Sequence, residues 1–396
     1  MIKSDLFSSI GFSFLSLLLF LPIFSSISFE INNLVSFDRS IWISGQFQKE
    51  TGLDLRHYLI SLPLSIIFVI LFAIKYFSKI IVNKSYQLTI GWILFVLIIN
   101  FSFGDVSAMF LKVLGAMILF LTSILVFDEH FSRVNSSIKN AEERNNLESY
   151  YISKPFFLTV FTLLVSYIIY RDDTFIVPWL KIYNFDQYLT YSLFIFIGCF
   201  FRQKWQVIFL FAIVTYFSYV TRSDGLKIML IILFISYLLY VKNFIWLKKY
   251  SSYFIKFAIV CIILYQFLSY FFINVRDFFP QNLSSRMEII FLYFKNVNFN
   301  TLFFPLHNDI SIIDYLHNEV LTILATCGFV GCYLFYKTLY NRINIIFNKN
   351  FGFAISLSIV IIIGSVLVLP TLHTFTGIII AYLIAFYSTF GNDKYS

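Results

Sequence analysis

Apolar residues occur in runs of about 15–21 residues that are separated by short polar segments, and such runs recur about twelve times along the chain. This length matches the ~20 residues with which an α-helix crosses the ~30 Å hydrocarbon core of a bilayer. The pattern predicts spans at residues 9–29, 58–77, 87–103, 106–127, 155–170, 188–201, 206–220, 225–241, 253–273, 317–336, 351–369 and 375–390. We therefore expect an all-α, polytopic integral membrane protein with about twelve transmembrane helices, in which residues 1–396 form a single transmembrane domain.

The composition supports this class and excludes others. Hydrophobic residues make up 59% of the 396 residues and charged residues only 13%, which is about half the share in globular proteins. Mean hydropathy is +0.81. A soluble domain cannot bury this much apolar surface, because single cores stop growing near ~250–300 residues. The composition thus excludes a soluble enzyme, a disordered chain and a nucleic-acid-binding module.

The distribution of lysine and arginine orients the helices. With the N-terminus inside, the inside loops hold 17 of these residues and the outside loops 9, although the outside segments are longer in total. Cytoplasmic loops carry such an excess of positive charge. The bias predicts that both termini are cytoplasmic, and it explains the net charge of +8 without a nucleic-acid partner. We interpret residues 9–29 as a retained first span, since this run is long for a signal peptide and lacks a clear A-x-A cleavage site.

Three connections stand out by their polarity. We expect the inside connection 128–154, which mixes both charge signs, to be solvated. The outside connections are 30–57 and 274–316, and the latter is the longest in the C-terminal half. Within 274–316, Ser285 and Glu288 form a capping-box pattern, and Met287, Ile290, Phe291 and Phe294 follow at helical spacing. These residues predict a short amphipathic helix that lies on the outer face of the membrane.

Arg286 and His317 are the main candidates for chemistry in this region. Arg286 would lie in the first turn of the amphipathic helix, where free backbone N–H groups also favour an anion; anchoring to lipid headgroups is the alternative role. His317 opens the tenth span, and Asp314 as N-cap would place it at the third helical position. The positive end of the helix dipole there favours a neutral imidazole, which can act as a general base. The alternatives are that His317 only bonds a loop carbonyl, or that His307 is the base.

Arg222 lies in a short polar break between two spans, on the same predicted side as His317. A guanidinium can hold a phosphate through two hydrogen bonds, whereas its alternative role is to extend toward the membrane surface. Lys227 could reach the same layer. The chain has no P-loop, no G-x-G-x-x-G, no H-E-x-x-H and no G-x-S-x-G pattern, and no cluster suits a metal. We expect neither a metal nor another cofactor.

Four segments together resemble the superfamily of bacterial O-antigen polymerases and O-antigen ligases. They are Thr221-Arg222-Ser223, Ser284-Ser285-Arg286-Met287, Leu316-His317-Asn318-Glu319-Val320-Leu321 and Gly328-Phe329-Val330-Gly331. The resemblance covers roughly 221–336, together with the overall topology, and the His-Asn pair followed by Gly-x-x-Gly is its most specific part. The first segment departs from the commoner Ser-Arg-Gly, so Arg222 is a weaker candidate than His317. The N-terminal half carries no recognisable motif.

The resemblance implies a glycosyltransferase of the bacterial inner membrane, with a helical periplasmic loop, 274–316, between spans 9 and 10. The donor would be an oligosaccharide on undecaprenyl diphosphate, and an acceptor hydroxyl would attack its anomeric carbon. His317 would be the base, and Arg222 and Arg286 would stabilise the diphosphate. Arg276, Asn318, His307 and Lys227 are expected to bind substrate. Membrane lipid is the other expected partner, together with a protein that sets chain length.

Four functions remain open at this point, and one of them is a non-catalytic membrane scaffold. A polymerase adds the glycan to a second lipid-linked repeat unit, and a ligase adds it to the lipid A core. Loop 274–316 is shorter than we expect for a ligase, and the aromatic-rich composition is typical of O-antigen gene clusters, so the sequence favours a polymerase. An O-antigen flippase of similar size is a transporter instead. It would show repeat symmetry and broken helices near mid-membrane, and we find no internal repeat.

Overall fold

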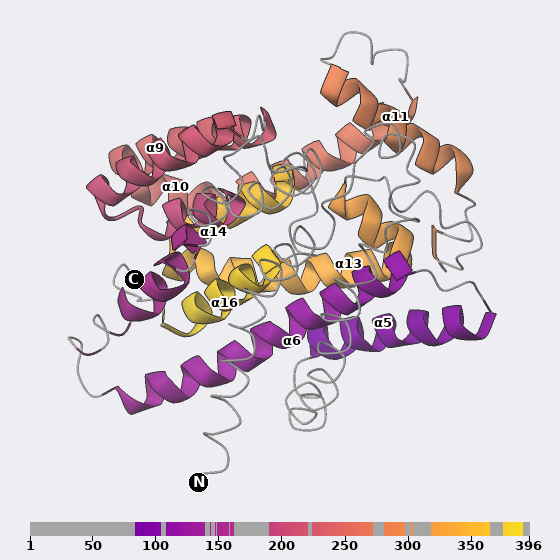
Figure 1. Cartoon of the computed structure of the whole chain (residues 1–396), viewed down its shortest axis with the longest axis horizontal. Helices are drawn as coiled ribbons and strands as arrows, with labels where there is room; N and C mark the ends of the chain where they lie inside the picture. Colours follow the sequence, from indigo (N-terminus) through magenta and orange to yellow (C-terminus); the bar gives the residue numbers. More distant parts are fainter. Residues whose placement is uncertain are drawn as a thin grey trace, which may run out of the picture.

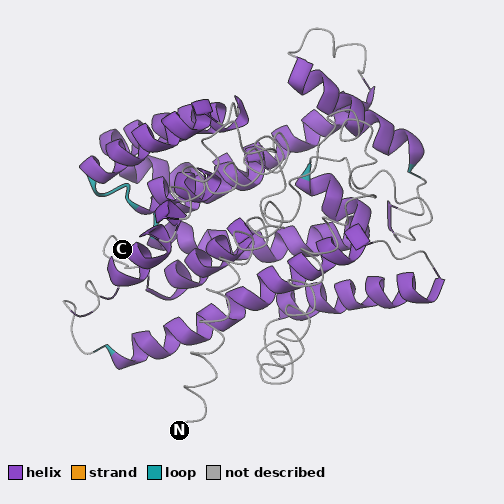
Figure 2. Cartoon of the chain, viewed as in Figure 1, coloured by secondary structure: helices purple, strands orange, loops and turns teal. Residues whose placement is uncertain are grey.

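A computed structural model describes residues 84–103, 108–138, 143, 147, 149–157, 159–161, 190–220, 224–271, 281–297, 302–303, 318–364 and 375–390. Within these ranges every regular element is a helix, and no strand occurs (Figure 2). The predicted all-α class is therefore confirmed for the described residues. The helices are α5 (Lys84–Phe103), α6 (Ala108–Ser137), α9 (Lys204–Val220), α10 (Asp224–Phe271), α11 (Gln281–Asn296), α13 (Glu319–Lys349), α14 (Phe351–Ile359), the π-helix η3 (Val360–Gly364) and α16 (Phe375–Phe390). A further apolar helix covers Thr190–Cys199.

Helices α5, α6, α13 and α16 pack together as one group, with α5 at its edge (Figure 1). Helix α6 makes its most extensive contact with α16, and α13 packs on α5, α6 and α16. Phe131 of α6 is completely buried, and its ring meets those of Tyr382, Phe386 and Phe390 of α16 edge to face. Aromatic pairs in this geometry add about 0.5–1.5 kcal/mol to the gain from burial. The abundant Phe and Tyr residues thus hold these helices together.

A second group of helices packs beside the first. Helix α10 contacts α9, α14 and η3, and the helix Thr190–Cys199 packs tightly on α14. A Cβ atom at Gly198 would lie 2.3 Å from the backbone oxygen of Gly352, so the two backbones can approach this closely only because both residues are glycine.

Three helices in the described part of the chain are long and apolar enough to cross a membrane: Val113–Ser137, Gly225–Lys242 and Glu319–Lys349. Large apolar side chains also point outward, including Phe209 at 63% exposure and Trp205 at 84%. In water such a surface would be unfavourable, whereas lipid solvates it. These features indicate a membrane protein. Three predicted spans agree closely with observed helices, namely 87–103 with α5, 206–220 with α9 and 375–390 with α16.

Two expectations about the loops are wrong. The apolar pattern predicts two spans at 225–241 and 253–273 joined by an inside loop, but residues 224–271 form the single 48-residue helix α10. At 1.5 Å per residue it is about 72 Å long, so Lys242 and Lys248 lie in a helix rather than in a loop. The connection 128–154 is not simply solvated, because α6 continues to Ser137 and packs its residues against α13 and α16.

Candidate functional site

The predicted amphipathic helix of the region 274–316 exists as α11, Gln281–Asn296. Met287, Ile290 and Tyr293 are buried along one side of it, and Glu288 is exposed. Burial also raises the pKa of the Tyr293 hydroxyl, which therefore stays neutral. The expected position on the outer face of the membrane stays a prediction. Helix α10 and the start of α13 cover the apolar side of α11, so protein rather than lipid buries it.

The expected start of α11 is also wrong. The helix begins at Gln281, so Ser285 and Glu288 lie in its interior and do not cap its N-terminus. Arg286 accordingly lies in the second turn rather than the first. The free backbone N–H groups of the first turn are therefore not next to Arg286 in the helix. Its position is four residues before Ile290 and seven before Tyr293, which puts all three on one side of the helix.

Helix α13 begins next to the predicted base. Asn318 is its N-cap, with φ −142° and ψ 111°, and the Asn318 Oδ1 atom accepts a hydrogen bond of 3.1 Å from the backbone N–H of Leu321. The predicted N-cap, Asp314, is therefore wrong, and His317 precedes the cap instead of occupying the third helical position. Thr322 continues the local pattern, since its hydroxyl donates to the carbonyl of Asn318 at 2.8 Å.

Asn318 has an unusual environment for a capping residue. Only 2% of it is exposed, and its Nδ2 atom is buried without a hydrogen-bond partner. Glu319, the next residue, is completely buried. A buried amide N–H that makes no hydrogen bond costs about 1–3 kcal/mol, so an oxygen atom supplied by a ligand would be bound favourably here. Asn318 is therefore a candidate hydrogen-bond donor to substrate, as the sequence led us to expect.

One hydrophobic cluster joins α11 to the first part of α13. Its buried members are Ile290 and Tyr293 from α11 and Leu321 and Ala325 from α13. Ile290 follows Arg286 by one helical turn, and Leu321 is hydrogen-bonded to Asn318. The helix that carries Ser284–Met287 thus packs on the first turns of α13.

The structure does not describe the surroundings of every predicted site residue. Arg222, Arg276, His307 and His317 lie outside the described residues, and Arg286 is placed by its backbone only. Lys227 lies in the first turn of α10 with an exposed side chain. The roles expected of these residues stay predictions.

Sequence reasoning missed Trp92 of α5. Gly328 breaks α13 with φ 68° and ψ 178°, and the Trp92 Nε1–H donates a 2.8 Å hydrogen bond to the carbonyl of Cys327 at this break. Gly328 and Gly331 were recognised in the sequence as a motif, but a single chain gives no signal that pairs them with a tryptophan 235 residues earlier.

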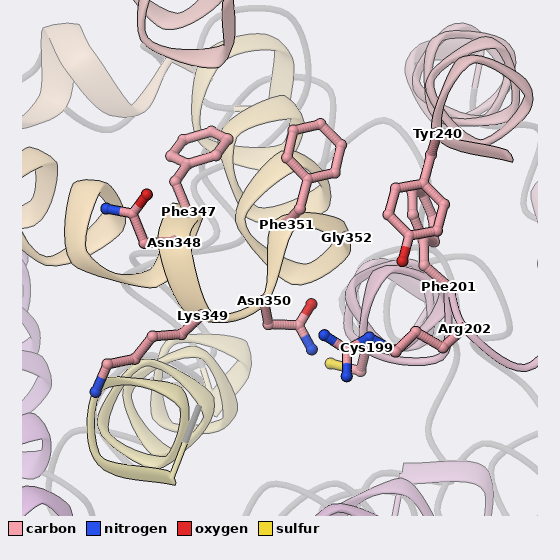
Figure 3. Close-up of a pocket in the computed structure, with 10 residues that line it drawn as sticks. All are labelled: Cys199, Phe201, Arg202, Tyr240, Phe347, Asn348, Lys349, Asn350, Phe351 and Gly352. Carbon is pink, nitrogen blue, oxygen red and sulfur yellow. The ribbon is translucent and has the colours of Figure 1, made fainter. Parts of the chain in front are cut away.

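A shallow pocket lies at the other end of α13 (Figure 3). It is lined by Cys199, Phe201, Arg202, Tyr240, Phe347, Asn348, Lys349, Asn350, Phe351 and Gly352. The Lys349 ammonium bonds the carbonyl of Ser388, so that it points away from the pocket. None of the predicted site residues lines this pocket. The described residues also contain no group of three His, Cys, Asp or Glu side chains that could hold a metal ion.

No protein-family model, no curated protein and no solved structure matches this chain.

Proposed function

We propose that this protein is an O-antigen polymerase of the bacterial inner membrane, which joins undecaprenyl-diphosphate-linked repeat units at the periplasmic face. The observation that supports this best is the packing of α11 on the start of α13 through Ile290, Tyr293, Leu321 and Ala325. It brings the helix of Arg286 beside the end of α13 that follows His317. A cation that holds diphosphate and a base that activates a hydroxyl must be neighbours in such a reaction.

The proposed reaction is a single displacement at the anomeric carbon of the donor. His317 takes the proton of the acceptor hydroxyl, the oxygen forms the new glycosidic bond, and the bond to the lipid diphosphate breaks. Arg286, with Arg222 and Arg276, stabilises the charge on the leaving diphosphate. Asn318 donates from its Nδ2 atom to a substrate oxygen. The diphosphate linkage itself supplies the driving force, and a partner protein sets the chain length.

Site-directed variants in a strain that lacks the chromosomal gene test these roles. Arg286→Ala and His317→Ala should each reduce the lipopolysaccharide ladder to core with one repeat unit, because removing a general base costs about 10²–10⁴-fold and removing a charge-stabilising group about 10²–10³-fold in rate. Lys295→Ala is the control, since Lys295 is an exposed cation at the far end of the same helix. All variants are first checked for equal amounts in the membrane. A normal ladder from His317→Ala would refute its role as base.

A ligase and a transporter are the competing functions. One observation favours the transporter, namely the break at Gly328, nine residues or about 13 Å into α13. If the protein is a polymerase, the purified protein in vesicles should lengthen a lipid-linked glycan that is already in the leaflet that faces the active site. A transporter would instead move the unlengthened lipid-linked unit from one leaflet to the other, and a ligase would need lipid A core as acceptor.

A further inference from the structure

The break in α13 needs a partner from outside the helix. Gly328 adopts φ 68°, which lies in the left-handed region that residues with a Cβ atom rarely occupy. A break removes the regular i to i−4 hydrogen bonds around it, and in an apolar environment the freed backbone groups must find other partners. The Trp92 Nε1–H provides one such partner at the carbonyl of Cys327, at 2.8 Å.

Gly331 makes this hydrogen bond sterically possible. A Cβ atom at Gly331 would lie 2.5 Å from the Cβ atom of Cys327, and 2.7 Å from Cδ1 and 2.8 Å from Nε1 of Trp92, all well inside normal contact distance. The two glycines of the motif therefore have different tasks. Gly328 allows the chain to turn, and Gly331 leaves room for the indole ring that holds the turn.

Helix α5 is also fixed to α13 beyond the break. The Thr89 hydroxyl donates to the carbonyl of Leu334 at 3.2 Å and lies 3.0 Å from the hydroxyl of Thr338. Thr89 and Trp92 are three residues apart and thus share one side of α5. That side of α5 therefore contacts α13 both at the break, through Trp92, and beyond the break, through Thr89.

The break sets the direction of the first segment of α13, Glu319–Cys327. This segment runs at a large angle to the rest of the helix (Figure 1). Leu321 and Ala325 within it pack on Ile290 and Tyr293 of α11, and Asn318 caps its free end. Any change in the break would move this segment relative to α11.

We infer that Trp92 is a positioning residue, which holds the break at Gly328 and so keeps the Asn318 end of α13 against α11. Its effect on catalysis rests on the proposed function, because it requires the active site to lie at that end. The effect of Trp92 on the break is independent of the proposed function. The nearby thiol of Cys327, which is completely buried, can report on the break directly.

The test uses purified protein in which Cys327 is the only cysteine, with Cys199, Cys261 and Cys332 changed to Ala. Trp92→Phe removes the indole donor and keeps an aromatic ring. Loss of one buried hydrogen bond corresponds to about fivefold to tenfold in a local opening equilibrium, so Cys327 should react with a membrane-permeant maleimide faster by about that factor. Trp205→Phe is the matched control, since Trp205 is 84% exposed on α9 and should leave the rate unchanged.

A second variant tests the contact from its other side. Gly331→Ala should displace the indole and accelerate labelling of Cys327 in the same way. The added methyl group also meets the Cβ atom of Cys327, so the two changes share only the contact with the indole, and their accelerations should combine to less than their product in the double variant. Labelling at the parental rate in Trp92→Phe, or independent effects of the two changes, would overturn the inference.

Ladder synthesis separates this inference from the proposed function. If Trp92→Phe opens the break, it should also shorten or abolish the ladder, while Trp205→Phe keeps it. An open break with a normal ladder would overturn the positioning role. Faster labelling in a protein whose parent makes no ladder at all would refute the proposed function and leave the assignment of Trp92 to the break intact.

Discussion

The ion pair between α6 and α13 gives the sharpest prediction about stability. The Arg342 guanidinium lies 2.7 Å from the carboxylate of Asp128, and the two side chains are only 17% and 20% exposed. Arg342 also lies over the ring of Tyr86, with 5.4 Å to the ring centre, which links α5 to the same pair. Arg342→Met keeps the apolar stem but leaves the carboxylate without its guanidinium.

The expected loss follows from the two contacts. Removing one partner of a buried ion pair costs about 3–5 kcal/mol, and the partial exposure of this pair lowers that figure to about 2–3 kcal/mol. The cation–π contact adds about 0.5–1 kcal/mol. In total we expect a destabilisation of about 3 kcal/mol, which corresponds to a fall in Tm of about 4 °C for a chain of 396 residues.

A thermal unfolding series on detergent-purified protein measures this loss. The double variant Arg342→Met, Asp128→Leu should regain most of the lost stability, because it no longer buries a carboxylate that has lost its guanidinium partner. An Arg342→Met protein with the parental Tm would refute the coupling of α6 to α13 through this pair. A double variant that melts as low as the single one would refute the electrostatic reason given for it.

Three further predictions concern single contacts. Gly198→Ala should lower Tm by several degrees, because its methyl group would collide with the backbone oxygen of Gly352 and such overpacking costs about 1–3 kcal/mol; a parental Tm would contradict this. Tyr382→Phe removes the 2.8 Å hydrogen bond to the carbonyl of Tyr151 and should cost about 1 kcal/mol in thermal unfolding. Asn318→Ala should lower the stability by ~1 kcal/mol, because the N-cap of α13 is lost, and should abolish the lipopolysaccharide ladder. Asn318→Ser should keep the N-cap and the stability but still lose most of the ladder. A full ladder from Asn318→Ser would show that its amide does not bind substrate.

The amino-acid sequence predicted a helix correctly where a single apolar run of residues forms a single helix. Helix α16 covers Phe375–Phe390 as expected, and α5 starts three residues before its predicted start at residue 87. The sequence failed where helices continue through polar residues. The charge of Lys242, Lys248 and Lys249 predicts a loop, but lysine is a good helix former, and α10 runs through all three.

For the candidate site, the sequence predicted the helix α11 but not the exact start of α11 or of α13. The spacing of Met287 and Ile290 identified α11, but the capping-box pattern at Ser285 gave the wrong start, since such short patterns also occur inside helices. Asp314 was as good an N-cap candidate as Asn318 by residue type, and only the backbone conformation at Asn318 decides between them. The hydrogen bond of Trp92 to Cys327 depends on packing between distant segments, which no local pattern contains.

The most direct test of the proposed function is a gel of lipopolysaccharide from a strain that lacks this gene, with the lipid-linked glycan pool analysed beside it. A polymerase predicts lipid A core that carries a single repeat unit, no ladder, and single units on undecaprenyl diphosphate. Bare core with long polymer on undecaprenyl diphosphate would mean a ligase, and bare core with single units confined to the cytoplasmic leaflet would mean a transporter. Either of these results would contradict the account.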